Sequence, residues 1–207
     1  MIGPCAPYAA GVSDDDLVRR LRAGDEAAFN EVINAYHPSM VRLAQSFVSS
    51  RAIAEEVAQD TWVAVLKGLE GFEGRSSLKT WIFHILANRA RSTGAREQRS
   101  VPVDPGAEGS VDKRRFDDGG TWSDPPPHWS DEIIEKLSSG PFLEQVQAAL
   151  ARLPESQRAV VTLRDLDGLS SKEVCDVLRI SEANQRVLLH RGRSRIRAIF
   201  EDEVVTR

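Results

Sequence analysis

The sequence has few of the residues that build disulfide scaffolds, metal centres and membrane spans. Its 207 residues include two cysteines, Cys5 and Cys175, which are too few for a disulfide framework or a zinc site. It has no run of eighteen or more apolar residues, and its N-terminal segment lacks the basic flank and long apolar core of a secretion signal. These absences predict a cytoplasmic protein without membrane insertion.

Signatures of catalysis are also missing. The four histidines are scattered, and the sequence contains no phosphate-binding loop, nucleophile elbow or metal-ligand spacing. The sequence therefore predicts no catalytic residue, no metal site and no cofactor, and an enzyme is the least favoured class of function.

Negative charge is concentrated in the middle of the chain. Residues 101–140 carry nine acids and four bases, whereas the segments on either side are close to neutral. The same stretch is rich in proline and glycine and has almost no aliphatic periodicity before Ile133, which indicates a long flexible acidic linker. A solvated spacer and a tethering or nucleic-acid-mimicking segment both fit this composition. Trp122 and Trp129 within it match nothing that assigns them a role.

Apolar residues at three- and four-residue spacing predict helices throughout the segment before the linker. Leu17, Val18 and Leu21 form one such stripe, which Gly24 ends, and the pattern resumes beyond it until Pro38, where a kink or a new helix is expected. No alternating strand pattern occurs. The sequence thus predicts an all-α fold of two small helical domains joined by the acidic linker.

A helix predicted from Leu78 onward has two distinct faces. Its expected buried face consists of Leu78, Trp81, Ile82, Ile85 and Leu86, and the opposite face carries Thr80, His84, Asn88 and Arg91. Hydroxyl, imidazole, amide and guanidinium groups in one stripe suit contact with a nucleic-acid strand. An ordinary solvated helix face would show the same pattern.

The C-terminal segment predicts a helix-turn-helix. Ser170 and Glu173 have the spacing of a capping box, Arg179 and Ile180 form a short break, and Ser181 can cap the following helix. A short helix, a tight turn and a second helix are the parts of a motif that places its second helix in a DNA major groove.

The second helix of this motif separates an apolar side from a basic side. Leu188, Leu189, Gly192, Ile196 and Ile199 share the apolar side, and Arg186, Val187, His190, Ser194 and Arg197 share the other. Five arginines and no acid lie between Arg186 and Arg197, which favours DNA as the ligand. Arg186 and His190 are central enough to reach base edges, Val187 suits a thymine methyl group, and Arg191 and Arg193 flank them toward phosphates.

Three strings in the order of the chain resemble the extracytoplasmic-function (ECF) sigma factors of bacterial RNA polymerase. They are "AGDEAAFNEVINAYHPSMVRLAQSFV", "AEEVAQDTWVAVLKGLEGFEGRSSLKTWIFHILANRAR" and "LPESQRAVVTLRDLDGLSSKEVCDVLRISEANQRVLLHRGRSRIR". The resemblance implies an N-terminal tail at 1–12, a sigma region 2 domain at 13–99, the linker at 100–140 and a sigma region 4 domain at 141–207.

The resemblance also implies roles for single residues. Docking to the clamp helices of the largest polymerase subunit is expected of Gln59, Asp60 and Trp62. Contact with the melted minus-ten element is expected of the loop at residues 71–77 and the helix after it, through Arg75, Lys79, His84, Asn88 and Arg91. Recognition of the minus-thirty-five duplex is expected of Ser181, Asn184, Arg186, Val187, His190, Arg191 and Arg193. Trp81 matches a tryptophan of the family, but its phase on the helix favours a core role.

The function implied is that of an alternative sigma factor. Such a protein binds the largest and second-largest subunits of core RNA polymerase and directs transcription initiation at promoters, here expected to be those of a stress or envelope-response regulon. An anti-sigma protein is the further partner that the resemblance implies. The alternative is a helix-turn-helix regulator that acts without being a polymerase subunit, and such a regulator needs no strand-capturing first domain.

Overall fold

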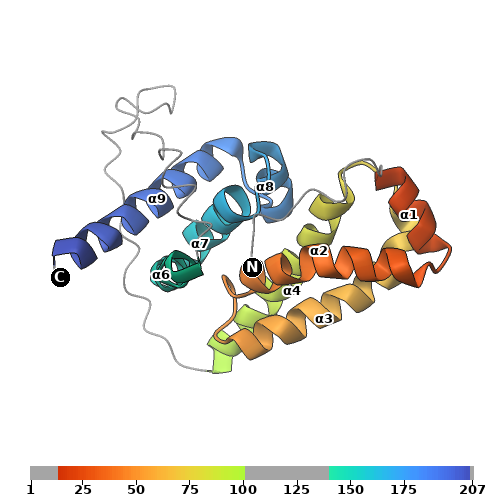
Figure 1. Cartoon of the computed structure of the whole chain (residues 1–207), viewed down its shortest axis with the longest axis horizontal. Helices are drawn as coiled ribbons and strands as arrows, with labels where there is room; N and C mark the ends of the chain where they lie inside the picture. The colour runs from red at the N-terminus through yellow and green to blue at the C-terminus, as the bar shows by residue number, and fades with distance from the viewer. Residues whose placement is uncertain (1–13, 101–139, 206–207) are drawn as a thin grey trace.

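The structure is a computed structural model that describes residues 14–100 and 140–205, which form helices and their connections with no strand among them (Figure 1). The all-α prediction is therefore confirmed for these residues. The N-terminal tail and almost all of the predicted linker, with Trp122 and Trp129, lie outside the described residues.

Two groups of helices follow one another along the chain. The first unit comprises α1 (Asp14–Arg22), α2 (Glu26–Ala44), α3 (Arg51–Gly68), the short 3-10 helix η1 (Leu69–Gly71) and α4 (Leu78–Ser100). The second unit comprises α6 (Gly140–Ala151), α7 (Glu155–Val161), the π-helical turn η3 (Thr162–Leu166), α8 (Ser171–Leu178) and α9 (Glu182–Val205). The domain boundaries drawn from the sequence remain a prediction.

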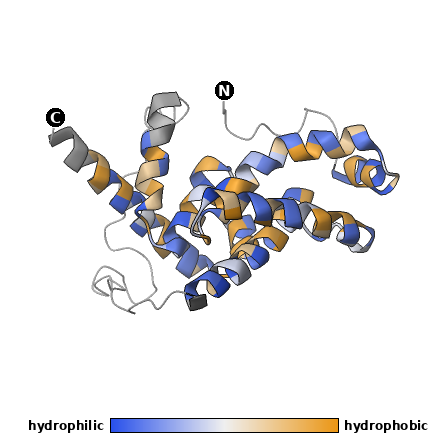
Figure 2. Ribbon diagram, turned by 90° about the horizontal axis from the view of Figure 1, so that it is seen from below, coloured by the Kyte–Doolittle hydropathy of each residue, from blue (hydrophilic) through white to orange (hydrophobic). Residues whose placement is uncertain are grey.

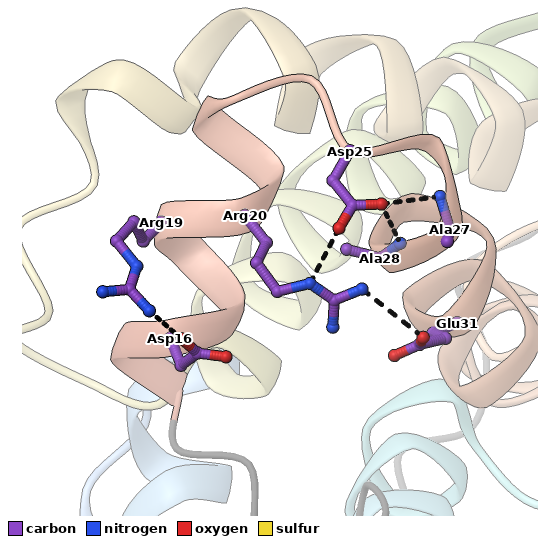
Figure 3. A network of polar contacts seen from close by, with 7 residues as sticks. All are labelled: Asp16, Arg19, Arg20, Asp25, Ala27, Ala28 and Glu31. Atoms are coloured by element: carbon purple, nitrogen blue, oxygen red, sulfur yellow. Dashed lines mark hydrogen bonds and ion pairs between the residues drawn. The ribbon is translucent and has the colours of Figure 1, made fainter.

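The corner between α1 and α2 is built from a glycine and a capping aspartate. Gly24 has a φ of +76°, which glycine adopts without steric cost, and Asp25 accepts hydrogen bonds from the first amides of α2 (Figure 3). The amide of Ala28, and next the side chain of Arg20, hold the pKa of Asp25 below its ordinary value. The predicted end of the first helix at Gly24 is confirmed.

The core of the first unit lies between α2, α3 and α4. Val32, Met40, Ile82, Phe83 and Leu86 are almost completely buried there. Along each helix the hydrophobic and hydrophilic segments alternate, as amphipathic helices require (Figure 2). Pro38 does not begin a new helix, because α2 continues through it as one helix, and the alternative of a kink there stays a prediction. A proline removes only one backbone donor, and here the remaining bonds and the packed core hold the helix together.

The predicted local features of the helix-turn-helix are present. Ser170 and Glu173 form a reciprocal capping box at the start of α8, and Arg179 ends that helix with a left-handed φ of 55°. The Ser181 hydroxyl then accepts a hydrogen bond from the Asn184 amide at 3.2 Å and caps α9. The capping box, the break and the second cap are therefore confirmed.

The two units pack directly against each other. One continuous hydrophobic cluster joins residues of α2, α3 and α4 to Val160, Leu163, Leu169, Val174 and Val177 of the second unit. Figure 1 shows α8 beside α4 at this junction, and α3 along the opposite edge of the first unit. The helix-turn-helix thus lies against the helix that the sequence marked as a strand-binding element.

Candidate nucleic-acid interface

The N-terminal part of α9 presents the exposed half of the interface. Asn184 and Arg186 are exposed, and the Arg186 guanidinium makes only a surface ion pair with Glu182, one turn earlier, at 3.1 Å. Val187, His190 and Arg191 are half-buried beside them. The Ser181 hydroxyl serves as the helix cap, so it has a structural partner of its own. This face holds a cation that can exchange a weak partner for DNA.

Arg193 points back into its own unit. Its guanidinium forms a two-pronged contact with the Asp165 carboxylate, with Nε to Oδ2 at 2.9 Å and Nη2 to Oδ1 at 2.5 Å. Such a fork is a strong, oriented ion pair, and both side chains are largely buried. The structure therefore gives Arg193 a role in holding α9 against η3, which the helical projection did not anticipate.

The apolar side of α9 packs as projected, with one addition. Ile196 is buried, Gly192 lies against α7, and Leu188, Leu189 and Ile199 are partly buried. Gln185 is also buried, and its Oε1 accepts a hydrogen bond from the Ser171 hydroxyl of α8 at 2.8 Å. This polar contact joins the two helices of the motif, and its only sequence signal is that Gln185 lies one turn before Leu188 and Leu189.

The proposed polymerase-docking residues on α3 divide between surface and core. Gln59 and Asp60 are exposed, but Trp62 is buried, lies edge-on to Phe29 and donates from its indole nitrogen to His37 Nδ1 at 3.2 Å. The expectation that Trp62 offers a docking surface is therefore corrected. Trp62 follows the helical phase of buried neighbours, and this phase was readable from the sequence.

Sequence reasoning missed two apolar side chains on the same helix. Val63 and Leu66 are each about half exposed, and among the described residues they are the large apolar side chains that are exposed. Leu66 also lines a cavity of about 350 Å³ that it shares with the α1–α2 corner and Phe29. The apolar part of the surface next to Gln59 and Asp60 therefore comes from Val63 and Leu66.

The polar face of α4 contacts the second unit and is half-buried instead of fully open to solvent. Lys79 donates to the main-chain oxygen of Asp167 at 2.7 Å, and Arg91 donates to the main-chain oxygen of Leu178 at 3.0 Å. Thr80, which the sequence placed on this face, is buried and donates to Glu173 at 3.1 Å. The predicted apolar face is confirmed, with Leu78, Ile82 and Leu86 in the core and Trp81 and Ile85 partly buried against it. The polar face differs from the solvated face that the sequence also allowed, because it lies against α8 and the turn before it.

His84 and Asn88 lie in the same contact. The Arg179 side chain donates to His84 Nε2 at 2.8 Å, and the Asn88 amide lies 3.2 Å from the same nitrogen. Burial, then the charges of Arg179 and Arg91, lower the pKa of His84, so the ring is neutral here at neutral pH. Arg75 stands apart from this group, exposed in the preceding loop and paired with Glu73.

The described residues include no cluster of three or more metal-ligating side chains. Within the same part of the chain, no helix combines the length and the apolar character needed to cross a bilayer. The chemistry of the interface is that of hydrogen-bond donors and fixed charges.

Comparisons with known proteins agree with this architecture. Residues 32–100 match the family model of sigma-70 region 2, and residues 143–196 match that of sigma-70, region 4. The ECF RNA polymerase sigma-E factor of Salmonella typhimurium strain LT2 is 27% identical over 188 residues, which cover 89% of this chain and 93% of the relative. The sigma-E factor of Haemophilus influenzae is 28% identical over 189 residues, which cover 91% of this chain and 95% of the relative.

Two solved structures share the fold. CnrH in complex with the cytosolic domain of CnrY gives a TM-score of 0.59 at 20% identity, covering 91% of this chain and 97% of CnrH. The sigma factor RpoE in complex with the anti-sigma factor NepR from Bartonella quintana gives 0.57 at 21% identity, covering 84% of this chain and 96% of RpoE.

A helical first unit, a helix-turn-helix second unit and the two region matches in this order define a sigma factor. The chain belongs to the sigma-70 family, and within it to the ECF sigma factors. It is an alternative sigma factor, a non-enzymatic protein that binds core RNA polymerase and directs it to promoter DNA.

Proposed function

We propose that this sigma factor divides promoter recognition between the outward face of α9 and the polar face of α4. The observation that carries the proposal is the exposed basic face at the start of α9, in the second helix of a helix-turn-helix. Asn184, Arg186, Val187, His190 and Arg191 read and hold the minus-thirty-five duplex, because donors at this end of a recognition helix reach base edges.

The first unit takes the melted strand and the polymerase. Arg75 in the loop, with Lys79, His84, Asn88 and Arg91 of α4, supplies donors for bases and phosphates of the minus-ten element. Docking to the largest polymerase subunit falls to Gln59, Asp60, Val63 and Leu66 of α3. Apolar side chains beside exposed polar groups are typical of a protein interface.

The names of the relatives support proposals about the regulation and the cellular role of this chain. Both curated relatives are sigma-E factors, and the two solved neighbours are held by partner proteins, one of them named as an anti-sigma factor. We infer that an anti-sigma protein regulates this chain as well, that its regulon answers stress at the envelope, and that it acts in the cytoplasm, where RNA polymerase works. The acidic linker joins the two recognition units on the polymerase.

Run-off transcription with purified core RNA polymerase and single-base promoter variants tests the proposal. Arg186→Ala is expected to cost about 1 to 3 kcal/mol and to relax preference at one or two base pairs of the upstream element, because a central arginine can contact guanine with two bonds. Arg193→Ala, which loosens α9 from Asp165, is the matched comparison and should weaken all sequences alike.

The losses that the two variants show across the set of promoter variants decide between the interpretations. Equal uniform losses for the two variants would mean that the face of α9 only attracts DNA, and the proposed register would be abandoned. Specific binding of promoter duplex by the free chain, with no gain from core polymerase, would support a regulator that acts alone.

A further inference from the structure

Helix α1 contacts both ends of the loop that carries Arg75. At the C-terminal end of α1, the Arg22 guanidinium donates to three main-chain oxygens, which are those of Leu69 at 3.2 Å, Glu70 at 3.3 Å and Phe72 at 2.5 Å. These carbonyls belong to η1 and the residue after it, where the end of a helix leaves acceptors without partners inside the helix. Arg22 therefore fixes the point at which the chain enters the loop.

The first turn of α1 holds the other end of the loop. The Asp14 carboxylate accepts a hydrogen bond at 2.9 Å from the amide of Leu78, the first residue of α4. The Ser77 hydroxyl accepts from the Thr80 amide at 3.1 Å, so two amides at the start of α4 have side-chain acceptors. A carboxylate in this position also meets the positive end of the helix dipole. The start of α4 is thus fixed relative to α1.

The two anchors are the first and the last residue of one helix. Asp14 and Arg22 bound α1, so about 12 Å of helix lies between their Cα atoms along its axis. Leu17, Val18 and Leu21 are buried in the core of the first unit and hold this helix in place. One rigid element therefore sets the distance that the loop must span.

Between the anchors, the loop is open to solvent. The Phe72 ring packs against that of Trp81 at 4.9 Å between centroids, and residues 73–75 beyond it are exposed. Arg75 makes an ion pair with Glu73 at 3.0 Å, and exposed pairs of this kind impose little order. A loop loses conformational entropy when it closes on a ligand, and less is lost when its ends are already fixed. The anchors on α1 reduce this cost.

We propose that α1 presets the loop at residues 71–77 for strand capture, and that Arg22 and Asp14 are positioning residues for the minus-ten contacts. The inference rests on the proposed role of this loop, through Arg75, at the melted element. Arg22 acts through the main chain of the loop, and Asp14 acts through the first amide of α4. Their loss should therefore change which bases are accepted more than it changes the overall attraction for DNA.

The test uses holoenzyme assembled from purified core RNA polymerase and the full chain. It is incubated with a random-sequence pool of DNA single strands of about 20 nucleotides, and the retained strands are sequenced, with core polymerase alone as background. Base preference among retained strands does not depend on how much of the protein is active, so a loss of stability does not imitate a loss of positioning. Amide hydrogen exchange of the free full-length chain reports the order of residues 69–78.

Arg22→Ala and Asp14→Ala, verified as folded by circular dichroism, should speed exchange in residues 69–78 and lower the base preference on the order of threefold. Arg19→Ala and Asp15→Ala are the matched controls, since they remove the same charges from the same helix. Arg19 pairs with Asp16 of α1 itself (Figure 3). Both controls should keep the exchange and the preference of the wild type.

Two conservative variants separate positioning from charge. Removing the acid at Asp14 should raise the general attraction for DNA, whereas losing the acceptor for the Leu78 amide should lower the base preference. Asp14→Asn keeps an acceptor oxygen and should restore most of the preference. Arg22→Lys presents one ammonium group in place of a planar fork of donors, so it should restore only part.

The results that contradict the inference differ from those that contradict the proposed function. The inference is overturned if either the exchange or the preference stays at its wild-type value in Arg22→Ala and Asp14→Ala, or if the two controls change equally. The proposed function fails if Arg75→Ala leaves the preference unchanged, or if wild-type holoenzyme enriches no sequence beyond those retained by core polymerase alone.

Discussion

Helices α4 and α9 both carry a stripe of polar and cationic side chains, but the stripe of α4 contacts the other unit, whereas that of α9 is exposed at its start, at Asn184 and Arg186. On α4 the stripe meets backbone carbonyls, a carboxylate and Arg179 of the second unit, whereas on α9 Arg186 meets only Glu182, one turn away on the same helix. A polar stripe shows which side of a helix points away from the apolar core of its own unit. It does not show whether solvent or another part of the chain lies against that side.

The largest expected effect on stability concerns a glycine on the packed side of each helix. A Cβ atom at Gly94 of α4 would lie 2.0 Å from the main-chain oxygen of Phe47, and one at Gly192 of α9 would lie 2.6 Å from a side-chain methyl group of Val161. Because backbone yields less than a side chain, Gly94→Ala should lower the free energy of unfolding by about 3 kcal/mol and Gly192→Ala by about 1 kcal/mol. Urea unfolding measures both, and equal losses would contradict the stated order.

A second experiment compares the covered and the open cations directly. Arg91 is half-buried, donates to Leu178 and lies over the Phe47 ring at 5.1 Å from its centre, while Arg186 is exposed. Arg91→Ala should lower the free energy of unfolding of the free chain by about 1 to 2 kcal/mol, and Arg186→Ala should change it by less than about 0.5 kcal/mol. If urea unfolding gives the two variants the same stability, the α4 face is no more covered in solution than that of α9.

The smallest expected effect is a dependence of the free energy of unfolding on pH, which arises from His84 on α4. Where α4 contacts the second unit, burial and then the charges of Arg179 and Arg91 lower the pKa of His84 from 6.5, and Asp176 opposes them. The contact of His84 with the second unit is therefore at full strength above about pH 6.5 and weakens as the pH falls below that value, because the ring takes up a proton more readily in the unfolded chain.

The change should be less than about 0.5 kcal/mol, since the ring is partly exposed to solvent. The measurement is urea unfolding between about pH 5.5 and 7.5 for the wild type and His84→Gln. Their difference removes the contribution of Asp167, whose pKa burial raises against the opposing effect of Arg42. Parallel pH profiles for the two proteins would show that His84 does not titrate in the contact.

Local features of this fold were predictable because they depend on near neighbours in the sequence. The capping box, the break at Arg179 and the end of α1 at Gly24 each involve residues within a few positions of one another. The apolar side of α9 followed from helical periodicity alone. Trp62 was assigned to the surface by resemblance, although its phase with buried neighbours on α3 already indicated the core.

The contacts that decide the site were not predictable in this way. Arg42 and Asp167 are 125 positions apart, and Lys79 and Asp167 are 88 apart. Neither residue type nor spacing links such groups, because their proximity depends on how two units pack after each has formed its helices. The same holds for Arg193, whose partner Asp165 lies on a different helical segment 28 positions away.

The number of residues in the π-helical turn η3 determines how the helices after it are placed. Its closing bond runs from the Asp167 amide to the Thr162 carbonyl at 2.9 Å, so the turn holds one residue more than an α-helical turn would. Deleting that residue would restore an α-turn and rotate everything beyond it by roughly 100° about the α7 axis. Arg42 would then lose Asp167 while α8 and α9 kept their own sequences intact. A deletion of one residue in this turn would therefore remove the contact between the two units without changing any residue that makes it.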